Sequence, residues 1–121
     1  MPIVEIEITL REHETLQENL ASSLADELGE IFGSPPGTTW VKLQGLPISQ
    51  YAENGSTPEG TYPVFVKVIK SEQPDPLELQ KEAVAITNAV ATVCRRPVEN
   101  VHIIFDPGGR NRVSFGGKLV T

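Results

Sequence analysis

Alternating aliphatic and charged side chains open the chain, which is the pattern of a half-buried β-strand. Residues 1–8 show it most clearly, with three aliphatic residues on one face and two glutamates on the other: Val4, Ile6 and Ile8 against Glu5 and Glu7. Residues 39–43, 62–69 and 101–105 are three further predicted strands. Pro2 cannot donate a backbone hydrogen bond, so it fits only the first position of a strand or a sheet edge.

Two segments between these strands carry apolar residues every three or four positions, which predicts amphipathic helices. The first stripe comprises Leu16, Leu20, Leu24, Leu28 and Ile31. Thr9 and Glu12 have the spacing of a capping box at its start, and Gly33 is expected to end it. The second helix is predicted to begin at Asp75-Pro76, and its stripe comprises Leu79, Ala83, Ile86, Val90 and Val93. Arg95 and Arg96 are expected in its last turn.

The strand–helix–strand pattern occurs twice, with a period of about sixty residues. Pro2 and Pro63 are 61 positions apart, as are Pro36 and Pro97. Each half (2–60 and 61–121) predicts one βαβ unit, whose two strands run parallel. We therefore expect a two-layer α+β fold in a single domain, 1–121, with a four-stranded sheet and two helices on one face. Oligomerisation is expected to bury the other face, with its valines, isoleucines, Phe65 and Trp40.

Composition narrows the class of protein. The chain has 121 residues, 39% hydrophobic and 21% charged, as in one soluble globular domain. It has neither a signal-peptide pattern nor an apolar run long enough for a membrane helix, and its lone Cys94 fits a reducing cytoplasm. The net charge of −6 argues against nucleic acid or an anionic membrane as partner. No metal and no cofactor is expected. A small anionic substrate is compatible with the negative net charge, because a local cluster of arginines can bind it.

Pro2 is the candidate with unusual chemistry. If Met1 is removed, its nitrogen becomes a secondary amine that can act as a base or a nucleophile. Pro63 cannot do this because its nitrogen is fixed in a peptide bond, so one site per chain is expected. The ordinary alternative is that Pro2 has no chemical role, and a retained Met1 would leave its nitrogen an unreactive amide.

The Pro2-Ile3-Val4 start, the two βαβ units and the Phe115-Gly116-Gly117 hairpin together resemble the tautomerase superfamily. That superfamily includes 4-oxalocrotonate tautomerase and macrophage migration inhibitory factor. The resemblance implies a homotrimer with an active site near each N-terminal proline, at a subunit boundary. It also implies that Pro2 acts as general base on a small 2-oxo or enol carboxylic acid. A terminal amine with a reference pKa near 8 suits this role, because an apolar pocket and a nearby cation lower that pKa.

The same resemblance suggests residues that bind the substrate, namely Lys42, His102, Arg110, Arg112 and Phe115. Lys42 and His102 fall near the position of a family arginine, and Phe115 follows the position of the family's pocket aromatic by two residues. His102 is equally well explained as a packing residue, and the arginines as surface charges. Two other functions stay open, a non-catalytic trimeric scaffold or binding protein and a related dehalogenase or decarboxylase.

Overall fold

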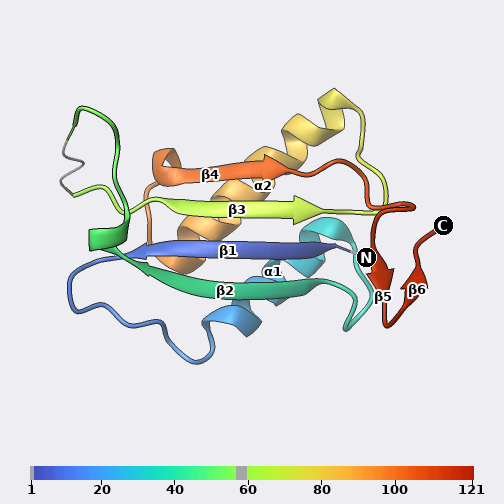
Figure 1. Ribbon diagram of the computed structural model, residues 1–121, viewed down its shortest axis with the longest axis horizontal. Helices are drawn as coiled ribbons and strands as arrows, with labels where there is room; N and C mark the ends of the chain where they lie inside the picture. Colours follow the sequence, from blue (N-terminus) through green and yellow to red (C-terminus); the bar gives the residue numbers. More distant parts are fainter. Residues whose placement is uncertain (1, 57–59) are drawn as a thin grey trace.

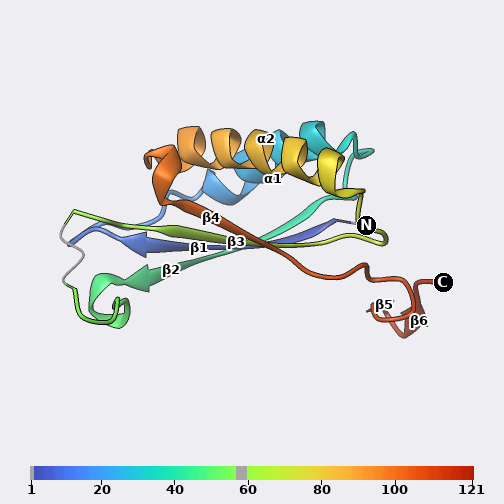
Figure 2. The ribbon, with the colours of Figure 1, turned by 90° about the horizontal axis from the view of Figure 1, so that it is seen from above.

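Both βαβ units contribute to one four-stranded sheet, and two helices cover one of its faces (Figures 1 and 2). The computed structural model describes residues 2–56 and 60–121. Its elements are β1 (Ile3–Leu10), α1 (Leu20–Phe32), β2 (Trp40–Pro47), η1 (Ile48–Gln50), β3 (Val64–Ile69), α2 (Pro76–Cys94), η2 (Val98–Asn100), β4 (Val101–Phe105), β5 (Ser114–Phe115) and β6 (Lys118–Leu119). None of the helices in this part of the chain is long and apolar enough to cross a membrane.

The strand order is β2-β1-β3-β4. Each βαβ unit supplies a parallel pair, β1 with β2 and β3 with β4, as the sequence predicted. The two units join through β1 and β3, which run antiparallel at the centre of the sheet with Ile3 opposite Ile69. This pairing places the end of β3 beside the start of β1. The β5–β6 hairpin, predicted around Gly116 and Gly117, lies at that same end of the molecule (Figure 1).

The core lies between the sheet and the helices. It is built from alternate residues of the inner strands and from the apolar stripes of both helices: Val4, Ile6, Ile8, Val64, Val66, Val68, Leu24, Leu28, Ile86 and Val90. α2 begins as predicted, since the Asp75 side chain accepts a hydrogen bond from the Glu78 N–H at 3.0 Å. Gly33 ends α1 with a φ of 61°, a conformation that glycine adopts without steric cost.

The predicted start of the first helix at Thr9 is wrong. β1 continues to Leu10, and α1 begins only at Leu20. The Thr9 N–H donates to the Pro63 carbonyl at 3.0 Å, and the Thr9 side chain is fully buried. Pairing along the sheet therefore determines the conformation of Thr9, rather than local capping.

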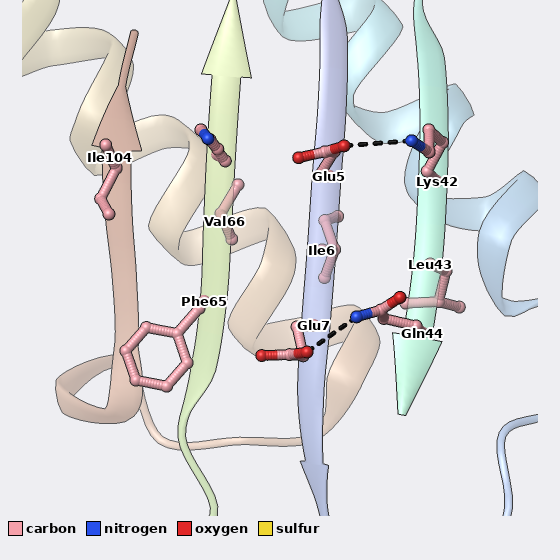
Figure 3. A pocket seen from close by; sticks show the side chains of 10 residues that line it. Glu5, Ile6, Glu7, Lys42, Leu43, Gln44, Phe65, Val66 and Ile104 are labelled. Atoms are coloured by element: carbon pink, nitrogen blue, oxygen red, sulfur yellow. Dashed lines mark hydrogen bonds and ion pairs between the residues drawn. The ribbon is translucent and has the colours of Figure 1, made fainter. Parts of the chain in front are cut away.

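The sheet face without helices also differs from the prediction, because most strand valines point away from it into the core. Figure 3 shows that this uncovered face carries Glu5, Glu7, Lys42 and Gln44 on β1 and β2. Apolar side chains on this face include the predicted Phe65 on β3 and Trp40 on β2, together with Ile104 on β4; Trp40 and Ile104 are 51% and 60% exposed. The uncovered face is thus mixed in polarity rather than aliphatic.

Candidate active site at the Pro2 end of the sheet

Pro2 lies buried just before β1, where its carbonyl accepts a hydrogen bond from the Trp40 N–H at 3.0 Å. It lines a hollow of about 290 Å³, which we call the Pro2 hollow. The other lining residues come from the turn after α1 and from the segment after β3: Phe32, Gly33, Ser34, Pro35, Thr38, Lys70, Ser71 and Glu72. Both segments reach Pro2 because α1 returns to the start of β2 and β3 ends beside the start of β1.

Lys70 is the cation among the residues that line this hollow. Its Nζ lies 2.9 Å from Oε2 of Glu82 on α2 and 5.2 Å from the centroid of the Phe32 ring. The Lys70 side chain is 24% exposed and that of Glu82 13%. Lys70 was not predicted as a site residue, because the repeat predicts only the two parallel strand pairs and not the antiparallel pairing of β1 with β3. Antiparallel pairing of the inner strands places the first residue after residues 62–69 beside Pro2.

Arg110 reaches the rim of the Pro2 hollow. Its Nη2 lies 2.6 Å from Oε1 of Glu72, which lines the hollow, and its N–H donates to the Ser71 carbonyl at 3.1 Å. Gly108 permits this approach, since a Cβ at that position would lie 2.7 Å from the Ser71 oxygen. Arg112 instead folds back on its own turn and donates to the carbonyls of Pro107 and Gly108.

Phe115 lies in an adjoining apolar hollow. Its ring meets the Trp40 ring edge-on with centroids 5.2 Å apart, and both line a space of about 220 Å³ together with Ile3. Thr38 lines this space and the Pro2 hollow alike. The structure therefore gathers Pro2, Arg110 and Phe115, predicted from the sequence, at one end of the sheet.

Lys42 and His102 lie elsewhere in the protomer. Lys42 pairs with Glu5 at 3.1 Å and lines a hollow of about 350 Å³ on the uncovered face (Figure 3). His102 lies against the Phe65 ring at 5.6 Å between centroids, in the row of the sheet that contains Glu7. Because a strand rises about 3.3 Å per residue, Glu7 is roughly 16 Å from Pro2. Within one protomer, His102 does not meet Pro2.

The equivalent end of the second repeat, at Pro63, is lined by different side chains. α2 ends at Cys94 and Arg95 caps it with a φ of 55°, so the prediction that Arg95 and Arg96 lie in its last turn is wrong. The Arg96 side chain, 1% exposed, pairs with Glu14 at 2.7 Å. It also donates to the carbonyls of Thr9, Tyr62 and Cys94. Thr9 and Cys94 are the counterparts, 61 positions away, of Lys70 and Gly33 in the Pro2 hollow.

Two groups at the Pro63 end have shifted pKa values. Burial alone would raise the pKa of Glu14, but hydrogen bonds from the Arg96 guanidinium and the Arg11 N–H, with both positive charges, lower it below 4.5. Burial raises the pKa of the Cys94 thiol to about 11, against a smaller opposing effect of Arg96. Cys94 is therefore a packing residue and not a nucleophile at neutral pH.

Three solved structures share this two-layer fold. The macrophage migration inhibitory factor of Trichinella spiralis has a TM-score of 0.75 at 16% identity, covering 97% of this chain and 98% of its own. Pt0534 inactivated by 2-oxo-3-pentynoate has a TM-score of 0.76 at 18% identity, over 98% of this chain and 94% of its own. A wild-type fused 4-oxalocrotonate tautomerase, F6, is described as an asymmetric trimer. Its TM-score is 0.76 at 15% identity, covering 97% of this chain and 94% of its own. No protein-family model and no curated protein sequence matches this chain.

Proposed function

We propose that this protein is a homotrimeric tautomerase that moves a proton on a small 2-oxo or enol carboxylic acid. Pro2 is the general base, and its nitrogen is free once Met1 has been removed. The observation that supports this most directly is the Pro2 hollow, where a buried proline shares a lined space with a cation, Lys70. The fold shared with tautomerases supports this activity but does not identify the substrate.

The chemistry requires a base near neutral pH and a positive group for the developing enolate. A terminal amine has a pKa near 8, which burial and a neighbouring cation lower toward the working pH. Pro2 takes a proton from the carbon next to the substrate's ketone and returns it to the enolate oxygen, or carries out the reverse transfer. The ammonium of Lys70 offsets the negative charge that forms between these steps.

Assembly into a trimer would cover the uncovered face. Trp40 and Ile104 are half or more exposed there, and β2 and β4 present unpaired sheet edges. Solved structures of the same fold are described as trimers. Lys42 and His102, which lie on this face, would then meet a neighbouring protomer, so they remain candidates for binding substrate together with Arg110, Arg112 and Phe115. Sedimentation should give three times the chain mass.

Covalent labelling tests the role of Pro2. The structurally similar Pt0534 was inactivated by 2-oxo-3-pentynoate, an activated alkyne to which an amine adds without loss of any atom. We expect this reagent to attach to Pro2, to increase the chain mass by one reagent molecule and to abolish turnover of phenylpyruvate enol. A form that retains Met1, in which the Pro2 nitrogen is an amide, should lose the label and most of the activity, typically by a factor of about 10² or more.

Pro63→Ala is the matched control, since Pro63 occupies the equivalent position in the second repeat but its nitrogen is an amide. It should keep both labelling and turnover. Equal rates for the processed wild type and the form that retains Met1 would remove Pro2 from the mechanism. Met1 retained in protein from its native cells, read from the intact mass, would favour a non-catalytic scaffold instead.

One observation favours a second function, a dehalogenase or decarboxylase that activates water. The ion pair of Glu72 and Arg110 stands at the Pro2 hollow and offers a carboxylate and a guanidinium beside the proline. Release of halide from a halogenated alkenoic acid, lost in Glu72→Gln, would support it. Turnover of phenylpyruvate enol without any halide release would favour the tautomerase.

A further inference from the structure

We propose that Lys70 binds the carboxylate of the substrate in the Pro2 hollow. This inference rests on the proposed function, because it assigns the residue that orients a 2-oxo acid toward Pro2. Lys70 was not among the residues suggested by the sequence. Its assignment comes from the position of its side chain, which lines the same hollow as Pro2 and stands at the end of β3.

Lys70 keeps hydrogen-bond donors for a ligand. An ammonium has three N–H donors, and within the described residues one of them serves Oε2 of Glu82 at 2.9 Å. The Lys70 Nζ also lies 5.2 Å from the centroid of the Phe32 ring. This cation–π contact does not replace an oxygen acceptor of the ammonium. A carboxylate can therefore accept from the remaining donors without breaking the pair with Glu82.

Glu82 holds Lys70 in position. Its carboxylate belongs to α2, and one oxygen, Oε1, is buried without a hydrogen-bond partner among the described residues. A largely buried carboxylate without its cation is unfavourable, so Glu82 holds the Lys70 side chain close to α2. The lysine side chain therefore loses little additional freedom when a ligand binds.

The other candidate cations at this end lie outside the Pro2 hollow. Arg110 forms a pair with Glu72 at 2.6 Å. Arg112 donates to two carbonyls of its own turn, Pro107 and Gly108. Of these three cations, Lys70 alone lines the Pro2 hollow. A carboxylate bound inside the hollow beside Pro2 would thus lie next to Lys70.

Two reagents that differ only in the carboxylate test the assignment. 2-Oxo-3-pentynoate carries it, and 3-pentyn-2-one is the corresponding uncharged methyl ketone. We expect Lys70→Ala to lower the rate at which the acid labels Pro2 by about tenfold or more, because a charge-assisted hydrogen bond is lost. The rate with the ketone should fall clearly less than the rate with the acid, because the ketone senses only the effect of the Lys70 charge on Pro2, which both reagents share. Lys70→Arg should restore most of the preference for the acid.

Lys81→Ala is the control for net charge, since Lys81 is an exposed residue on α2 whose ammonium pairs with Glu78. It should label like the wild type with both reagents. Peptide mapping confirms that the label is on Pro2, and thermal unfolding confirms that each variant is folded. If Lys70→Ala slows both reagents equally, or neither, the assignment of Lys70 is overturned while the role of Pro2 stands.

A binding titration separates the two proposals if neither reagent labels the wild-type protein, an outcome that refutes the reactive Pro2. Pyruvate would then be titrated into the wild type and Lys70→Ala and followed by NMR. Binding that falls about tenfold or more in the variant supports Lys70 as a carboxylate site. Equal binding, or no binding to the wild type, overturns it.

Discussion

The two ends of the sheet derive from one repeated pattern, yet one is open and the other is closed. At the first end, Pro2 lines a hollow together with Lys70, whose side chain is a quarter exposed. At the second end, Pro63 is buried beside Arg96, whose guanidinium is almost fully buried against carbonyls and the carboxylate of Glu14.

The difference shows how a duplicated unit can assign separate roles to its copies. Arg96, which follows the end of α2, has all its donors used by the protein. It stabilises the fold because it binds Glu14, in the segment between β1 and α1, and Thr9 in β1. A lysine with one protein acceptor retains the capacity to bind a ligand.

Removal of Arg96 should have the largest effect on stability. Arg96→Ala leaves the carbonyls of Thr9, Tyr62 and Cys94 without this donor and leaves Glu14 with Arg11 alone, so we expect a loss of about 3–5 kcal/mol in the free energy of unfolding. Urea unfolding measures it. Arg95→Asn, at an exposed position whose φ of 55° asparagine tolerates, is the control and should change stability by about 0.5 kcal/mol or less.

At the open end, stability and ligand binding should be separable. Lys70→Met alone strands the buried Glu82 carboxylate and should cost about 1–3 kcal/mol. Adding Glu82→Leu should recover most of that loss, because an apolar pair of similar volume replaces a partly buried ion pair. The double variant should remain unable to distinguish the acid from the ketone. Recovery of that preference would contradict a role for Lys70.

Acid should act on the closed end. The pKa of Glu14 is lowered in the folded protein, so its contribution to stability is fully present above the ordinary value of 4.5 and is lost as the pH falls through the lower folded value. We expect the difference in unfolding free energy between the wild type and Glu14→Gln to shrink over that acidic window. A difference that stays constant from pH 7 to acid would exclude this linkage.

The aromatic contact beside the Pro2 hollow should contribute less. Phe115→Leu keeps an apolar side chain but removes the edge-to-face contact with Trp40, which is worth about 0.5–1.5 kcal/mol. A double-mutant cycle with Trp40→Leu measures this coupling. An absence of coupling would mean that the β5–β6 hairpin does not fix the Phe115 ring against Trp40 in solution.

The smallest effect is expected at Cys94. Its thiol is buried and its pKa is raised to about 11, so the native protein should not react with a disulfide reagent at pH 8. Reaction should appear only on unfolding. In Arg96→Ala, which removes the donor to the Cys94 carbonyl, we expect it to begin at lower urea concentration. Fast reaction of the folded wild type would contradict the packing role.

The amino-acid sequence by itself determined the elements and how they are grouped. Alternation in residues 1–8, the apolar helical stripes and the Asp75-Pro76 start encode local conformation directly, and the repeat fixes two parallel pairs. Pro2 and Phe115 were predicted as site residues for their chemistry and their resemblance to a known pattern, and the structure places both at one end.

Only the tertiary structure decided which polar side chains share a space. Thr9 has a capping pattern but pairs with Pro63 across the sheet, and Arg96 has a helix-end pattern but is buried against a distant loop. Lys70 reaches Pro2 because β1 and β3 are antiparallel neighbours in a fixed register. Such contacts join residues far apart in the chain, and their energy depends on burial and on partners that no local pattern contains.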